Sequence, residues 1–289
     1  MNVIFVQKRI TKFINRFGNT NIFYYEHISD INRIIKEQHV DILYIIKGGR
    51  QSDGIITNAC KTIIHSVFHT DDPHGTIYCP ISDFLNKQYN TNFLVLPHIV
   101  RVYPTTEDLR CELNIPKNAT IFGTMSGHDA FDIDYVRKAV ISLSEDSRFN
   151  NIYFVFLNID QFYKPSNRLI FLPGTVNMEY KRKFINTCDA MLYGRRDGET
   201  FGLSCGEFAI CDKPIIAMNP NLPPSRFSAN HIDTLKSDII IHHNIGELIQ
   251  ILTNWDKYNK DVSNNGYKQY TPENVMRTFK TCIELCVDK

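Results

Sequence analysis

The sequence lacks a net charge, a long apolar run and a targeting signal. Its 32 Lys and Arg residues nearly balance 31 Asp and Glu residues, which leaves a charge of +1. A protein held to nucleic acid by phosphate attraction would be clearly basic, so we exclude nucleic acid as a partner. No apolar stretch is long enough for a signal core or a membrane span, so we expect a cytoplasmic protein without a transmembrane segment. Peripheral contact with a membrane surface stays open.

No two of the eight cysteines form a CxxC pair, a spacing typical of structural zinc sites. We therefore predict reduced, mostly buried thiols that pack as small apolar side chains. Cys282 and Cys286 are four residues apart in an expected helix, where residues at this spacing share one face. We expect both side chains to point inward.

Alanine is scarce, with 8 residues against 37 Ile and 26 Asn. This bias is typical of AT-rich genomes, so we expect a viral or an AT-rich bacterial source. The 14 Gly and 12 Pro residues are too few for a collagen-like or linker-like chain, and neither repeats nor low-complexity segments are visible. A length of 289 residues suits about two domains, at roughly 150 residues each.

Short apolar runs alternate with helical patterns along the chain. Expected strands cover residues 2–6, 21–25, 41–46, 61–65, 92–96, 119–123, 152–158, 169–172, 190–193, 214–218 and 239–242. Expected helices cover residues 30–38, 55–60, 134–144, 178–188, 202–210, 245–255 and 272–286. This alternation predicts an α/β fold in which parallel sheets carry helices on both faces. We expect two Rossmann-like domains facing a cleft, residues 1–105 and 106–271, followed by a terminal helix in residues 272–289.

Residues 194–207, with the sequence GRRDGETFGLSCGE, carry the chemistry. They follow an apolar strand and lead into a helix, and Gly202 lets the backbone approach a ligand closely. The N–H groups of Gly202, Leu203 and Ser204 would lie at the helix start, which favours an anion such as a diphosphate. Glu199 could accept hydrogen bonds from sugar hydroxyls, and Glu207 could hold a ribose diol.

Arg195 and Arg196 add positive charge beside the same turn, which suits a phosphate group. The alternative interpretation is a capped helix that binds nothing. Thr200 or Ser204 would then be the N-cap, while the glutamates would lie on a solvated first turn and the arginines would be exposed. The spacing alone does not separate the two interpretations.

The stretch ETFGLSCGE, residues 199–207, resembles the E-x7-E signature of the retaining glycosyltransferases of family 4, which have the GT-B fold. Four further segments fall in the order usual for that family: LIFLPGT, KFINTC, DAML and KPII. The resemblance covers residues 115–255 well and the N-terminal half weakly. It implies that the terminal helix crosses back to brace a shortened N-terminal domain.

In that family the first glutamate and the following turn contact the donor sugar and its diphosphate, and the second glutamate holds the nucleotide ribose. The loop after the LPG strand reads the base through its backbone. The resemblance therefore implies a donor site formed by Thr175, Val176, Glu199, Thr200, Phe201, Gly202, Leu203, Ser204 and Glu207.

One part of the family pattern is missing. The family has an arginine, soon followed by a lysine, after the first strand of the C-terminal domain, and both bind the diphosphate. Here Thr124 stands in the place of the arginine and no lysine follows. We assign Thr124 to the diphosphate site and expect Arg195 or Arg196 to compensate, with Arg196 as a catalytic candidate beside Glu199. A Gly-rich loop after the first N-terminal strand, where many relatives meet the acceptor, is also missing.

The family also places a histidine near the reacting sugar, at the end of an N-terminal strand. His65 in IIHSVF is the best positional match and our third catalytic candidate, and His74 and His98 are alternatives. Each could instead be a loop histidine that bonds to backbone. We expect no metal ligands, because GT-B enzymes typically need no catalytic metal and the spacing of the most tempting cluster matches no common site; that cluster is His69, Asp71, Asp72 and His74.

The resemblance predicts a retaining, metal-independent hexosyl- or deoxyhexosyl-transferase. The donor would be a UDP- or GDP-linked sugar, with no separate cofactor, and the acceptor a hydroxyl of a glycan, a lipid or a protein-linked glycan. One alternative is a GT-B protein that binds sugar nucleotides or glycans without turnover. Another is an epimerase or a phosphorylase; pyridoxal phosphate needs a lysine in the cleft, and we expect Lys181 and Lys183 to lie away from the donor turn.

Overall fold

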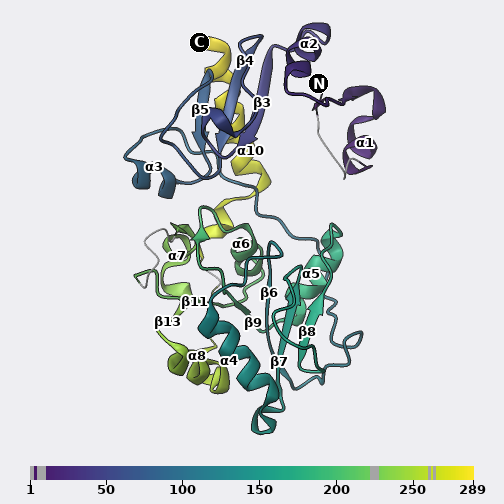
Figure 1. Cartoon of the computed structure of the whole chain (residues 1–289), viewed down its shortest axis with the longest axis vertical. Helices are drawn as coiled ribbons and strands as arrows, with labels where there is room; N and C mark the ends of the chain where they lie inside the picture. The colour runs from purple at the N-terminus through teal and green to yellow at the C-terminus, as the bar shows by residue number, and fades with distance from the viewer. Residues whose placement is uncertain (1–2, 5–10, 222–227, 260–261, 263–264) are drawn as a thin grey trace. The chain divides into compact units, whose positions relative to one another are not determined.

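The computed structural model describes residues 3–4, 11–221, 228–259, 262 and 265–289, and it divides into two compact units (Figure 1). Unit 1 comprises Met1–Pro97 together with Met276–Lys289, and unit 2 is the continuous segment His98–Val275. Each unit is built on parallel strands, as the alternation of apolar runs and helical patterns predicts.

The main sheet of unit 1 has the strand order β3-β4-β5. Its strands are β3 (Ile42–Lys47), β4 (Lys61–Ser66) and β5 (Ile77–Pro80), and both pairings are parallel. Five of the six residues of β4 are buried, as is usual for the central strand of a covered parallel sheet. The helix α2 (Ser29–Glu37) buries Ile31, Ile34 and Ile35, which confirms the predicted helical spacing. The remaining elements are α1 (Thr11–Phe17), α3 (Asp83–Tyr89) and a separate parallel pair, β1 (Val3–Ile4) with β2 (Ile22–Phe23).

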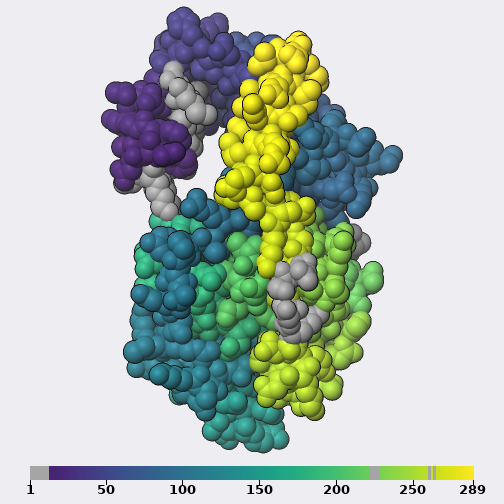
Figure 2. All heavy atoms as spheres, turned by 180° about the vertical axis from the view of Figure 1, so that it is seen from behind, coloured from purple at the N-terminus to yellow at the C-terminus, as the bar shows by residue number. Residues whose placement is uncertain are grey.

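The helix α10 (Pro272–Asp288) completes unit 1 from Met276 onward. Cys282 and Cys286 are fully buried, which confirms that both side chains point inward. The sulfur of Cys282 lies 3.4 Å from that of Cys79 on β5, although the two residues are 203 positions apart. The outer face of the helix, yellow in Figure 2, stays open to solvent. The C-terminal helix is thus a structural part of the N-terminal sheet's core.

Unit 2 contains a six-stranded parallel sheet with the order β13-β11-β9-β6-β7-β8. Its strands are β6 (Thr120–Met125), β7 (Ile152–Leu157), β8 (Leu169–Leu172), β9 (Ala190–Leu192), β11 (Ile215–Met218) and β13 (Ile239–His242). Numbered within the unit, this is the order of the doubly wound Rossmann sheet, which reverses between its first and fourth strands. The reversal lies between β6 and β9.

Helices follow most of these strands along the chain of unit 2, although β7 leads to β8 without one (Figure 1). They are α4 (Asp134–Glu145), α5 (Met178–Thr187), α6 (Leu203–Ala209), α7 (Asn230–Leu235), α8 (Ile245–Thr253) and α9 (Trp255–Tyr258). One apolar cluster packs α4 and α8 against the sheet and includes Phe122, Phe154 and Phe156. All six residues of β7 are buried, in keeping with the apolar run IYFVFL.

Two predictions for unit 1 are wrong. In both segments a polar side chain forms hydrogen bonds with main-chain groups. Residues 55–60 form no helix; the hydroxyl of Thr57 donates to Asn32 Oδ1 and accepts from the N–H of Ala59. Residues 92–96 form no strand. The amide of Asn86 bonds to both the N–H and the carbonyl of Phe93, which takes the place of a ladder.

Candidate functional site

The predicted donor residues from Glu199 to Glu207 follow β9, one of the two strands between which the strand order of the unit 2 sheet reverses. In open α/β sheets, ligands bind outside the carboxyl ends of the strands at this point, because the two connecting helices leave on opposite faces. Thr124 lies near the carboxyl end of the other strand, β6. The topology therefore brings both halves of the predicted diphosphate site to one edge of one sheet.

The turn between Glu199 and α6 has a tightly restricted backbone. Gly198 and Glu199 form the short strand β10 (Gly198–Glu199), which pairs in parallel with β12 (Ser228–Ala229). Gly202 follows with φ of 80°, in the left-handed region that favours glycine. A Cβ at Gly202 would lie 2.8 Å from the hydroxyl of Tyr267, so a larger residue is excluded by space as well as by conformation.

Two side chains that sequence reasoning missed hold this turn. The carbonyl of Phe201 accepts hydrogen bonds from Tyr267 Oη at 2.6 Å and from Asn230 Nδ2 at 2.9 Å. Both donors are buried. They lie 66 and 29 positions further along the chain, in segments without a motif, so no local signal could have identified them.

Glu199 is the first glutamate of the motif, and its side chain is 19% exposed. Arg195 Nη1 lies 3.4 Å from its Oε1, and the hydroxyl of Tyr193 donates to the same oxygen at 3.4 Å. Burial raises the pKa of the Glu199 carboxyl, and the Arg195 guanidinium partly offsets that effect. The carboxylate is thus held beside a cation and close to the glycine turn.

Glu207, the second glutamate, is more deeply buried, with 5% of its side chain exposed. Lys181 of α5 binds it side-on, with Nζ 2.8 Å from Oε1 and 2.9 Å from Oε2. Burial raises the pKa of Glu207, and the lysine opposes this shift. Lys181 is thus a partner of the second glutamate that the sequence did not predict.

Arg196 bonds to Asp132 and not to a glutamate of the motif. Its main-chain N–H donates to Asp132 Oδ1 at 2.7 Å and its Nη2 to the Asp132 carbonyl at 3.0 Å, and its side chain is half-exposed. Asp134 lies 3.8 Å from the same guanidinium. Of the two predicted arginines, the structure brings only Arg195 into contact with Glu199.

The other predicted donor-site residues vary in exposure. Thr124 is 2% exposed within β6. In the loop after β8, the hydroxyl of Thr175 accepts from the N–H of Asn177, which caps α5, while Val176 is 47% exposed. Beyond Gly202, Leu203 is 39% exposed and Ser204 is partly exposed. Thr200 is partly exposed and Phe201 is buried.

The three candidate histidines belong to different surroundings. His65 on β4 is 2% exposed, and its Nδ1 lies 2.5 Å from the hydroxyl of Tyr44. His74 contacts Lys47 Nζ through Nε2 and the Asp72 carbonyl through Nδ1, so its ring is held within unit 1. His98 lies in unit 2, where its ring centroid is 5.3 Å from that of Phe201, and burial lowers its pKa. Of the three, His98 adjoins the donor turn within a single unit.

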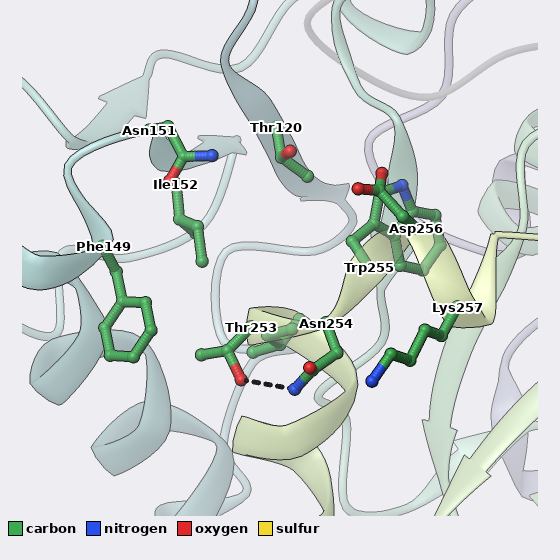
Figure 3. A pocket seen from close by; sticks show the side chains of 10 residues that line it. Thr120, Phe149, Asn151, Ile152, Thr253, Asn254, Trp255, Asp256 and Lys257 are labelled. Carbon is green, nitrogen blue, oxygen red and sulfur yellow. Dashed lines mark hydrogen bonds between the residues drawn. The ribbon is translucent and has the colours of Figure 1, made fainter.

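A pocket of about 230 Å³ lies elsewhere in unit 2 (Figure 3). It is lined by Thr120 and Ile152, the first residues of β6 and β7, and by residues at the end of α8, including Thr253, which accepts a hydrogen bond from Asn254. It therefore opens at the amino-terminal edge of the sheet, away from the strand ends that bear the motif.

Among the described residues, no group of three or more His, Cys, Asp and Glu side chains could hold a metal ion. Within the same ranges, every helix is too short or too polar to span a bilayer.

No protein-family model matches the chain, and no curated protein matches it in sequence. Solved structures do match. A glycosyltransferase from Rickettsia africae is 14% identical with a TM-score of 0.62, over 99% of this chain and 89% of that one. HepE from Anabaena in complex with UDP-glucose is 11% identical with a TM-score of 0.68, over 99% and 90% of the two chains. WaaG, a glycosyltransferase involved in lipopolysaccharide biosynthesis, is 11% identical with a TM-score of 0.61, over 92% and 86%. At these identities the likeness shows the fold: the chain has the α/β GT-B fold, with a small sheet in unit 1 that agrees with the predicted shortening.

Proposed function

We propose that the protein is a glycosyltransferase that takes a sugar from a nucleotide-diphosphate sugar. The observation that carries the proposal is a pair of glutamates, the partly buried Glu199 before the glycine turn and the buried Glu207 in α6, beside the point where the strand order of the sheet reverses. A carboxylate is costly to bury unless it has partners, and both of these lie where a ligand with hydroxyl groups would supply further ones. The likeness to HepE, whose structure contains UDP-glucose, supports the same conclusion.

In this proposal Glu207 accepts hydrogen bonds from the ribose, and Glu199 accepts them from the transferred sugar. The main-chain N–H groups of Gly202, Leu203 and Ser204 donate to the diphosphate, since none of them donates to another described residue. The loop at Thr175 and Val176 lies against the base. These assignments follow the family resemblance residue by residue.

The reaction requires stabilisation of the negative charge that develops on the diphosphate as the glycosidic bond breaks. Preorganised N–H groups at the Gly202 turn, with Arg195 beside it, would stabilise this charge, and Arg196 and Thr124 are further candidates. We infer transfer with retention of anomeric configuration, without a metal, to a hydroxyl of a glycan, a lipid or a protein-linked glycan. His65 remains the catalytic histidine of this proposal, with His98 as its competitor.

One observation favours a second candidate function, binding of a sugar nucleotide without transfer. Thr124 stands where the family has an arginine, and it is buried among the strands of the sheet. Among the described residues, Arg195 is the only arginine that contacts Glu199, and it already forms an ion pair with that carboxylate. A donor could therefore bind with too little positive charge to help the leaving group depart.

A ligand and turnover panel tests both candidates. UDP or GDP at a hundredfold excess over its dissociation constant should stabilise the folded protein by about 2.7 kcal/mol, which raises the melting temperature of a unit of this size by roughly 5–10 °C. Glu207→Gln should shrink the shift, and the exposed control Glu145→Gln should leave it unchanged. Nucleotide release from a UDP- or GDP-sugar, slowed by Glu199→Gln, would establish transfer or hydrolysis. Binding without release in any combination supports the second candidate, and no shift with any nucleotide overturns both.

A further inference from the structure

We propose that Lys181 is a second ligand of the nucleotide ribose and makes the site selective for ribonucleotides over deoxyribonucleotides. The inference deepens the proposed function and rests on it. Sequence reasoning assigned the ribose to Glu207 alone, because glutamate is the group that the motif supplies at that position. The structure adds a cation from α5 directly in front of that carboxylate.

The geometry leaves Lys181 with unused donor capacity. An ammonium group has three N–H donors. Two of them point at Oε1 and Oε2 of Glu207, at 2.8 and 2.9 Å. Within the described chain no acceptor takes the third. The lysine is also the more accessible partner, with 23% of its side chain exposed against 5% for Glu207. A ligand that approaches the carboxylate therefore meets the ammonium.

A vicinal diol matches this pair in chemistry. Each hydroxyl group carries one donor and two acceptor lone pairs. One ribose hydroxyl can donate to Glu207 while its neighbour accepts from Lys181, and each charge-assisted bond is stronger than a neutral one. A carboxylate alone could accept from both hydroxyls but could donate to neither. Loss of one hydroxyl from the ligand would leave a charged donor or acceptor in a largely buried site without its partner, which is costly.

The other two cations near Lys181 on α5 have partners other than Glu207. Lys183, on the same helix, bonds instead to Glu107 at 2.6 Å and to Glu179 at 3.1 Å. Arg182 contacts Cys211 and the Thr105 carbonyl. Neither of these cations reaches Glu207, so Lys181 is the one cation that bonds to it among the described residues.

The experiment compares binding of UDP and GDP with binding of their 2′-deoxy and 3′-deoxy forms. Wild-type protein should prefer the ribonucleotide at least tenfold over one or both deoxy forms, the effect of a single hydrogen bond to a charged group. Lys181→Met should reduce to threefold or less the preference over the deoxy form that lacks the hydroxyl bonded to Lys181, and Lys181→Arg, which keeps a donor, should recover most of that preference. Lys183→Met is the matched control and should keep the wild-type preference.

The outcomes separate this inference from the proposed function. If wild-type protein binds UDP or GDP and Lys181→Met keeps both the affinity and the full preference, Lys181 is not a ribose ligand and the proposed function stands. If wild-type protein binds no nucleotide, the proposed function fails and this inference fails with it. Should Lys181→Met fold poorly, Lys181→Gln, which replaces the ammonium with a neutral amide, decides the question: a full wild-type preference for the ribonucleotide over every deoxy form in that variant counts against the inference.

Discussion

The hydroxyl of Tyr267 lies 2.6 Å from the carbonyl oxygen of Phe201, and Asn230 donates to the same oxygen. A peptide group is planar and trans, so its N–H points opposite to its carbonyl. Fixing the carbonyl of Phe201 therefore also fixes the direction of the Gly202 N–H. Tyr267 and Asn230 therefore orient the donor turn without having to contact a ligand themselves.

Tyr267→Phe should remove one of these two bonds while keeping the ring in place. We expect the free energy of unfolding to fall by about 1–2 kcal/mol, the cost of losing one partner of a buried hydrogen bond, and nucleotide affinity to fall with it. Urea unfolding and nucleotide titration measure the two effects. Tyr163→Phe, which loses a bond to Glu145 on the surface, is the control and should change neither. An unaltered affinity in Tyr267→Phe would show that Asn230 alone holds the turn.

Gly202→Ala should be one of the most damaging small substitutions in unit 2. The new Cβ would meet Tyr267 Oη at 2.8 Å and His231 Cβ at 3.0 Å, at a φ of +80°. We expect a loss of about 1–3 kcal/mol in unfolding free energy and no measurable nucleotide binding. Gly127→Ala is the matched control, because its nearest neighbour would be Asp129 Oδ1 at 3.5 Å. Equal effects of the two substitutions on binding would contradict the role of the turn.

Nucleotide affinity should weaken on acidification through titration of Glu207. Burial raises the pKa of this carboxyl, with Lys181 acting against the shift and Cys211 as the other titratable neighbour. The ionised form accepts the ribose hydrogen bonds, so affinity is full above the raised pKa and falls as the pH drops through it. The fall should begin at a higher pH than for an ordinary glutamate, whose pKa is about 4.3.

Glu207→Gln supplies the control for this pH dependence. Its affinity should be lower at neutral pH and should follow only the titration of the ligand's own phosphates. Calorimetric titration across the acidic range separates the two profiles. Parallel profiles for the wild type and the variant would exclude Glu207 as the titrating group.

Arg195→Ala and Arg196→Ala should differ in their effect on turnover. Loss of Arg195 leaves the buried Glu199 without its cation, so the pKa of Glu199 should rise further and turnover should fall about tenfold or more. Arg196 contacts Asp132 and Asp134 instead, and its removal should cost less. Steady-state kinetics with a nucleotide sugar measures both. A larger loss in Arg196→Ala would restore Arg196 as the catalytic arginine.

Local sequence patterns were sufficient to predict much of the secondary structure of unit 2. Apolar runs such as IYFVFL form buried strands because neighbouring residues determine this feature, and residues 199–207 lead through a glycine turn into a helix as predicted. The failures arise where distant side chains decide the outcome. Asn86 replaces a ladder at residues 92–96, and Asn230 and Tyr267 fix the turn from other parts of the chain.

Lys181 shows the same limit at the candidate site. Its position on α5 followed from the sequence, but its contact with Glu207 depends on how α5 and α6 pack against the sheet. Helical periodicity gives the face on which a residue lies and not the partner that this face meets. The contact between this lysine and the second glutamate of the motif was for that reason not predicted.

The division of the chain also fixes an order of assembly during synthesis. Unit 2 is one uninterrupted segment, whereas the core of unit 1 needs α10, including the Cys282 that lies against Cys79. Domains generally fold as units as the ribosome releases them, with the N-terminal one first. The strands β3, β4 and β5 are synthesised first. The apolar face that α10 covers stays exposed until residues 276–289 have been synthesised after unit 2. We therefore expect unit 1 to complete its core after unit 2.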